Sequence, residues 1–110
     1  MDVSSALYER PGKYQHAYCE DMDRGGDIRV ICNLRANHDW MSTLLHELDH
    51  GVYFKYIDPR LPYLLREHAH LLTTEAVAMV MGNQTYDARW LAEIASVGAA
   101  PVGNRPALRN

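Results

Sequence analysis

The stretch His46-Glu47-Leu48-Asp49-His50 decides the interpretation of this chain, because it has the spacing HExxH. On a helix, residues four positions apart lie on one face, so both imidazoles can reach one metal ion. Glu47 follows the first histidine, where its carboxylate can reach a metal-held water molecule but not easily the metal. This arrangement is typical of zinc-assisted hydrolysis, in which a carboxylate accepts a proton from the water.

A third ligand is expected, because catalytic zinc keeps three protein ligands and one open position. The best candidate is Glu75, which stands in a second helical stretch. Its helical face is otherwise mostly apolar or small, and is formed by positions 68, 71, 72, 75, 78, 79 and 82. A carboxylate within an apolar stripe is costly to bury unless it is paired, and a metal ion is one such partner. A salt bridge from Glu75 to a neighbouring arginine is the alternative.

Several segments resemble the catalytic core of the angiotensin-converting-enzyme-like zinc peptidases and, more loosely, the related oligopeptidases. They follow the order of that family at nearly its spacing, and they are Gly26–Val30, His46–His50, Leu61–Arg66 and Thr74–Val77. The resemblance covers about two-thirds of the chain, from Lys13 to about Gln84. It is therefore more specific than HExxH alone.

The resemblance implies a zincin-like core in which His46, His50 and Glu75 bind zinc and Glu47 is the general base. It also implies a substrate-binding strand that pairs with the backbone of a peptide. The residues at that position are His16, Ala17 and Tyr18, and the first of these would bond a substrate carbonyl.

The chain also departs from the family pattern. Members are several times longer, and the tyrosine and histidine that stabilise their oxyanion lie downstream of the matching region. Each such donor is typically worth ~10²–10³ in rate. Met79 stands where the family has a carboxylate that supports a zinc histidine, and Asp49 replaces a small residue. The alternative function is therefore a zinc-binding fragment or accessory domain with little or no turnover.

The aspartate in HExDH also gives a minor alternative, a hydrolase similar to the peptide deformylases. That family uses two histidines and a cysteine as metal ligands. The cysteine candidate here is Cys32, but it lacks the Glu-Gly-Cys context of a deformylase.

Composition limits the remaining functions. The 110 residues leave room for one domain, with 47% apolar residues, 23% charged residues and a net charge of −3. Without a basic cluster we expect no nucleic-acid binding, and without a long apolar run no membrane span. Met1–Ser5 lacks a secretion-signal pattern. Cys19 and Cys32 do not form a disulfide framework, so we expect free thiols and a cytoplasmic location.

We predict an α+β, mostly helical fold with a small antiparallel hairpin and three helices. Residues 1–12 are expected to be weakly ordered, residues 13–97 to form the catalytic core, and residues 98–110 to be a loose tail. The hairpin strands are predicted at 13–19 and 27–34, joined by an acidic, glycine-bearing turn.

The predicted helices follow from capping residues. Asn37 should cap the first helix, which ends before Asp58 because a proline follows. The second should carry Pro62 in its first turn and stop at Gly82-Asn83. The third should span about 86–97, with a buried side formed by Trp90, Leu91, Ile94 and Val97.

Two further residues lie close to the motif in the predicted fold. His68 shares the face of Glu75, although a partnered or exposed histidine is the preferred interpretation. Asp49 is expected to support the site or to face solvent. Finally, nothing in the chain covers the cleft side, and the strand edge at 14–19 has unpaired backbone groups, so we expect a homodimer formed through either surface.

Overall fold

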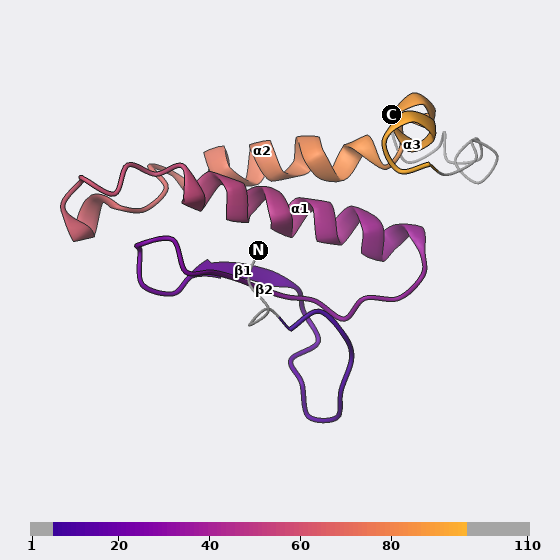
Figure 1. The fold of residues 1–110 in the computed structure, drawn as a ribbon, viewed down its shortest axis with the longest axis horizontal. Helices are drawn as coiled ribbons and strands as arrows, with labels where there is room; N and C mark the ends of the chain where they lie inside the picture. The colour runs from indigo at the N-terminus through magenta and orange to yellow at the C-terminus, as the bar shows by residue number, and fades with distance from the viewer. Residues whose placement is uncertain (1–5, 97–110) are drawn as a thin grey trace.

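The computed structural model describes residues 6–96 of the chain. Its elements, in order, are β1 (Tyr18–Asp21), β2 (Ile28–Ile31), α1 (His38–Lys55), the 3-10 helix η1 (Tyr63–Leu65), α2 (Leu71–Gln84) and α3 (Ala88–Glu93). The long helix α1 lies between the hairpin and α2, and α3 follows the end of α2 (Figure 1). The predicted α+β, mostly helical fold with an antiparallel hairpin is confirmed.

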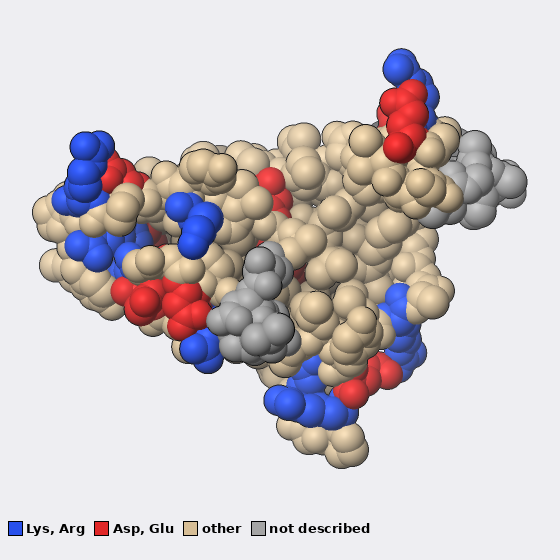
Figure 2. All heavy atoms as spheres, viewed as in Figure 1, with Lys and Arg blue, Asp and Glu red and all other residues tan. Residues whose placement is uncertain are grey.

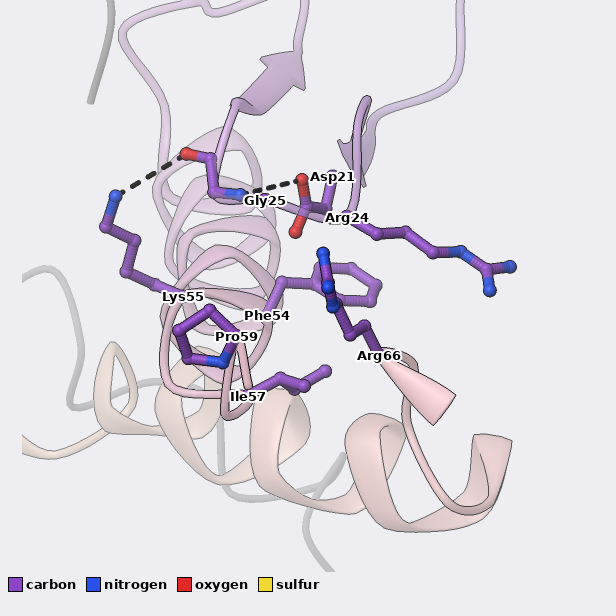
Figure 3. A pocket seen from close by; sticks show the side chains of 9 residues that line it. Asp21, Arg24, Gly25, Phe54, Lys55, Ile57, Pro59 and Arg66 are labelled. Carbon is purple, nitrogen blue, oxygen red and sulfur yellow. Dashed lines mark hydrogen bonds between the residues drawn. The ribbon is translucent and has the colours of Figure 1, made fainter. Parts of the chain in front are cut away.

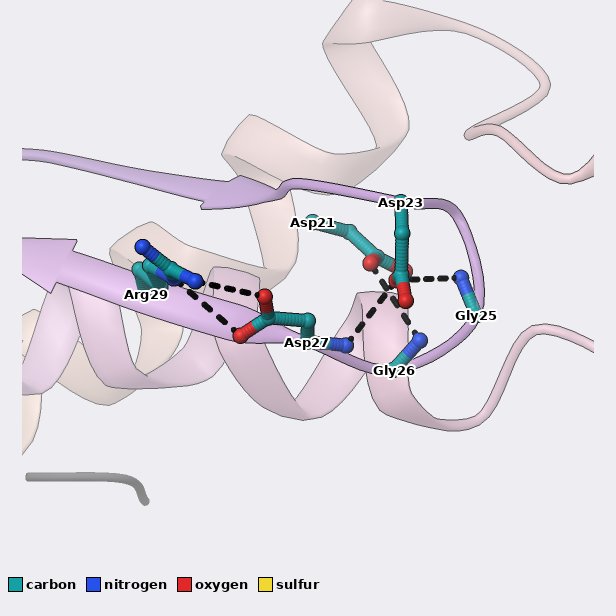
Figure 4. Close-up of polar contacts among 6 residues, drawn as sticks. All are labelled: Asp21, Asp23, Gly25, Gly26, Asp27 and Arg29. Carbon is teal, nitrogen blue, oxygen red and sulfur yellow. Dashed lines mark hydrogen bonds and ion pairs between the residues drawn. The ribbon is translucent and has the colours of Figure 1, made fainter. Parts of the chain in front are cut away.

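The hairpin turn is held by aspartate side chains that accept backbone hydrogen bonds (Figure 4). The Asp23 carboxylate accepts from the N–H of Gly25 at 2.8 Å and from that of Asp27 at 3.2 Å, and Asp21 accepts from Gly26 at 3.2 Å. These backbone donors lower the pKa of Asp23. Gly26 has φ +103°, a conformation that side chains disfavour, so glycine is required there.

The first strand begins later than predicted, because polar side chains bind the backbone that was expected to pair. The Asn33 amide donates to the carbonyls of Tyr14 and Gln15 at 3.1 and 3.0 Å. The Lys13 ammonium donates to three further carbonyls, those of Ala6, Tyr8 and Cys32. The segment 13–17 is therefore a loop, and the expected strand over 13–19 is wrong for most of its length.

The second strand is also shorter than predicted, although its backbone pairing continues beyond Ile31. The N–H of Cys32 donates to the Ala6 carbonyl and that of Leu34 to the Leu7 carbonyl, both at 2.9 Å. Ala6 also forms a parallel bridge with Ile31. Part of the segment that we expected to be weakly ordered, residues 1–12, thus lies against the sheet, while residues 1–5 are outside the described part.

Helix α1 begins and ends as predicted. The Asn37 side chain accepts a hydrogen bond from the N–H of Trp40 at 2.9 Å, which satisfies one of the free donors of the first turn. The helix ends at Lys55, before Asp58. The HExxH motif lies within its eighteen residues, and the helix runs between the hairpin and α2 (Figure 1).

Helix α2 begins well after Pro62, so that part of the prediction is wrong. Pro62 precedes the 3-10 helix, and α2 is instead capped by His70, whose Nδ1 accepts from the N–H of Leu72 at 3.0 Å. The helix also continues past Gly82 to Gln84. Gly82 is inside the helix because α1 is close: a Cβ there would lie 3.3 Å from the Ser42 carbonyl.

Helix α3 is shorter than the predicted 86–97: it begins at Ala88, after its cap Asp87, and ends at Glu93. The Asp87 carboxylate accepts from the N–H groups of Arg89 and Trp90 at 2.8 and 2.9 Å. Leu91 is fully buried, as predicted, but Ile94 is 68% exposed, so its predicted burial is wrong. Val97 and the predicted tail at 98–110 lie outside the described residues.

The outer surface of α2 is strongly apolar. Glu75 is the one charged residue in its sequence, and most of its large apolar side chains are exposed. In the view of Figure 2, most charged side chains lie toward the two ends and the lower part of the molecule, and the upper middle is mainly uncharged, with a few acidic atoms near its centre. Among residues 6–96, the helices do not include one long and apolar enough to cross a membrane.

Candidate metal centre

His46 and His50 lie one turn apart on the face of α1 that packs against α2. Their Nε2 atoms are 3.1 Å apart, and their rings meet edge to face with centroids 4.8 Å apart. This convergence follows from the i, i+4 spacing, which places both imidazoles on one side of the helix.

Glu75 faces these two imidazoles from α2. Its Oε2 lies 3.2 Å from the Nε2 of His46, and its Oε1 lies 3.3 Å from the Nε2 of His50. Within the described part of the chain, these three residues are the group of histidine, cysteine and carboxylate side chains that could hold one metal ion, and we call His46, His50 and Glu75 the metal-facing group. The two histidines, rather than the arginine of the alternative interpretation, lie beside the Glu75 carboxylate.

Thr74 fixes the orientation of His50. Its Oγ1 lies 2.8 Å from the Nδ1 of His50, and Thr74 is 3% exposed. If Nδ1 carries the proton and donates to the hydroxyl, the lone pair of Nε2 faces Glu75 and His46. Sequence reasoning missed this residue. Its position immediately before the candidate ligand was the available signal.

Met79 does not take the place of the carboxylate that the family pattern has at this position, because its side chain is 57% exposed.

Burial lowers the pKa of His50, an effect that the negative charge of Glu75 opposes. Burial therefore favours the neutral imidazole, which is the form that binds metals.

Glu47 is a buried residue of α1, and its charge reaches Cys19 of the hairpin. It is 8% exposed, and this burial is the main cause that raises its pKa; His46 acts in the opposite direction and Glu75 raises it further. Cys19 of β1 lies near enough for the Glu47 charge to act on it. Burial, together with that charge, raises the pKa of Cys19 to about 12.

The expected substrate-binding segment lies only partly on a strand. Tyr18 is the first residue of β1 and is 42% exposed, whereas His16 and Ala17 precede the strand. The His16 ring lies 5.3 Å from that of Tyr14 and does not belong to the metal-facing group. In the described part of the chain, β1 pairs with β2 alone, so its other edge is open.

His68 and Asp49 each have a buried polar atom that lacks a hydrogen-bond partner among the described residues. These atoms are the Nδ1 of His68 and the Oδ2 of Asp49. The His68 ring packs 6.2 Å from that of Phe54, outside the metal-facing group. His68 and Asp49 are both half-buried, and the charge of Asp49 acts on His50. The expectations of a partnered or exposed His68, and of an Asp49 that supports the site or faces solvent, stay predictions.

The two cysteines lie outside the metal-facing group. Cys32 is fully buried beside the sheet, and burial raises its pKa to about 11, with Glu47 adding to the effect. The deformylase alternative requires two histidines and a cysteine as ligands. In the described residues, the two histidines lie beside Glu75 and not beside a cysteine.

A hollow of about 200 Å³ lies between the hairpin turn and the end of α1 (Figure 3). Phe54, one turn after His50, forms part of its wall. Arg66 also lines the hollow, and its Nε donates to the Leu61 carbonyl at 2.7 Å. The hollow therefore combines aromatic and charged surface one helical turn beyond the second histidine.

Comparisons of the chain with protein-family models, with curated proteins and with solved structures found no match.

Proposed function

We propose that the chain is the core of a metallopeptidase that hydrolyses peptide bonds with zinc. The observation that carries the proposal is the set of distances among His46, His50 and Glu75. The resemblance of the surrounding segments to the angiotensin-converting-enzyme-like zinc peptidases points in the same direction.

The residues fit a tetrahedral zinc ion. Two ligand atoms each ~2.05 Å from zinc, at a tetrahedral angle, lie about 3.3 Å from one another. The two Nε2 atoms are 3.1 Å apart, close to this value. One oxygen of Glu75 lies 3.2 Å from the Nε2 of His46 and its other oxygen 3.3 Å from that of His50, and three ligand atoms, one from each residue, lie within 4.8 Å of one another. Two imidazoles and one carboxylate are also a donor set that catalytic zinc uses, which leaves a fourth position open.

Glu47 is the proton-transfer residue of the proposed mechanism. Zinc held by these ligands would supply a polarised water molecule whose pKa is lowered to about 7. Glu47 accepts the proton of the attacking water and then gives it to the leaving amine. Its burial beside His46 favours both transfers, because bulk water is kept away from the carboxylate.

An extended peptide is the proposed substrate, and the open edge of β1 is its proposed binding surface. A peptide there would add a strand to the sheet, so that main-chain hydrogen bonds hold it. The strand packs against α1, which carries the motif. In this arrangement His16, Ala17 and Tyr18 lie at the start of the bound segment.

A second candidate is a zinc-binding domain with little or no turnover. Tyr86 is the one tyrosine or histidine that follows Glu75 in the sequence, and it is therefore the nearest candidate for an oxyanion donor. Its ring instead lies 4.6 Å from that of His38, the first residue of α1, which precedes His46 by about two helical turns. Among residues 6–96, Tyr86 is therefore not placed beside the two histidines as an oxyanion donor, and this is the observation behind the second candidate.

The proposal is tested by measuring zinc content and the cleavage of a quenched-fluorescence peptide library with the same purified chain. One zinc per chain with cleavage supports the peptidase. One zinc without cleavage supports the second candidate, and a chain that takes up no zinc contradicts both.

We also propose a cytoplasmic location. The support is that Cys19 and Cys32 are free thiols, as proteins of a reducing compartment usually have.

A further inference from the structure

A shallow hollow of about 390 Å³ lies on the flank of the α1 and α2 pair. Its lining comes from α1, the two residues that follow it, and one residue of α2: Asp49, Val52, Tyr53, Tyr56, Ile57 and Val77. The lining includes none of the candidate metal ligands. Apart from the tyrosine hydroxyls, Asp49 is its one polar side chain.

The carboxylate of Asp49 is not neutralised by the residues around it. Its Oδ2 is buried and lacks a hydrogen-bond partner in the described part of the chain. Lys55, the basic residue in the last turn of α1, instead reaches toward the Gly26 carbonyl at 3.5 Å. Asp49 lines the hollow, so its negative charge favours a ligand there that brings a positive charge.

The surface around Asp49 is apolar and open. Val52 is 53% exposed, Val77 42% and Tyr56 85%. Such a rim can hold the methylene stem of a long cationic side chain while the charged end reaches the carboxylate. Arginine fits better than lysine, because its planar guanidinium stacks on aromatic rings and is more weakly hydrated than an ammonium, and Tyr53 and Tyr56 line the hollow.

We propose that this hollow is a docking pocket for an arginine side chain of a partner protein. The charge of Asp49 and the exposed apolar rim complement such a residue, and arginine set among aromatic side chains is a common centre of protein interfaces. The pocket does not depend on the proposed hydrolysis, because none of its lining residues holds the metal or moves a proton.

The probe for the test is N-acetyl-arginine amide, and its matched control is the uncharged isostere N-acetyl-citrulline amide. Both are titrated into the ¹⁵N-labelled full chain and followed by NMR. The arginine compound is expected to shift the amides of Asp49, Val52, Tyr56 and Val77, and to bind roughly five- to tenfold more tightly than the citrulline compound. Equal affinity for the two compounds overturns the proposal.

Variants locate the binding. Asp49→Asn should remove the preference for arginine, and Tyr56→Ala, at the most exposed wall, should weaken binding even if the first variant fails to fold. Glu75→Gln should leave the titration unchanged; loss of the preference there would place the probe at the metal-facing carboxylate and overturn the pocket.

A second measurement uses the chain without a probe. Asp49→Asn should raise its midpoint of thermal unfolding, because an unpaired buried charge is removed. A lower midpoint would mean that Asp49 has a partner within the chain, contrary to the proposal. If the parent chain self-associates and Asp49→Asn abolishes this association, the pocket binds a second copy of the chain. That result would contradict the proposal of a separate partner protein.

Discussion

Thr74→Val replaces the hydroxyl that orients His50 with a methyl group of similar size. The 2.8 Å contact between Oγ1 and Nδ1 is lost, and the buried ring nitrogen is left without its partner. The imidazole is then free to rotate or to change tautomer, so Nε2 no longer faces Glu75 in every molecule.

The expected loss of zinc affinity is about 10- to 100-fold, the range found when the residue supporting a metal-binding histidine is removed. This corresponds to about 1.4–2.7 kcal/mol. A buried polar group that loses its partner costs about 1–3 kcal/mol, so the two values agree. Competition with a chromophoric chelator measures the affinity directly.

Two variants serve as controls. Thr74→Ser keeps the hydroxyl and should retain most of the affinity. Thr73→Val makes the same chemical change at the adjacent, exposed position of α2 and should have no effect. Zinc affinity within twofold of the parent in a folded Thr74→Val chain, or an equal loss in Thr73→Val, would refute the reasoning.

Four other outcomes are expected. His50→Ala should abolish stoichiometric zinc binding, since two ligands leave the ion under-coordinated; full occupancy by metal analysis would contradict the assignment. Glu47→Gln should retain zinc and the circular dichroism spectrum but lose peptide cleavage, and cleavage within a few-fold of the parent would exclude Glu47 as the base. Cys19 and Cys32, with pKa values raised to about 12 and 11, should stay protonated at pH 8 and react slowly with iodoacetamide, faster as pH rises; rapid labelling of the folded chain by mass spectrometry would be inconsistent with this. The chain should form a homodimer through its open strand edge or cleft side, which a clean monomer in light scattering at high micromolar concentration would contradict.

Local signals in the sequence were sufficient for the central helix. Asn37 predicted where α1 begins, and the proline after Asp58 limited where it could end. The HExxH spacing also predicted that both imidazoles would face one point. Glu75 was identified because it interrupts an apolar stripe, and the structure places it beside both histidines; its role as a ligand stays a prediction.

The errors arise where distant residues compete with local preference. The loop at 13–17 is held by Asn33, which binds the carbonyls of Tyr14 and Gln15, and by Lys13, which donates to carbonyls outside the loop. These partners are distant in sequence, so the local pattern does not reveal them. Gly82 has the residue type of a helix end, yet it stays helical because Ser42 of α1 is close to it. Thr74 was missed because a hydroxyl within a helix gives no sign of which side chain it will contact.

The metal-facing residues come from opposite sides of one helix packing interface, His46 and His50 from α1 and Glu75 from α2. An ion held by all three would act as a cross-link between segments that are separated by a long loop. It would lose a ligand whenever the helices separate, so its binding free energy would stabilise their association. Few side chains of the described residues are fully buried, the largest being Leu91, Val30, Thr85 and Cys32. Because the interior formed by residues 6–96 is so small, the ion would hold these elements together as well as serve the proposed chemistry.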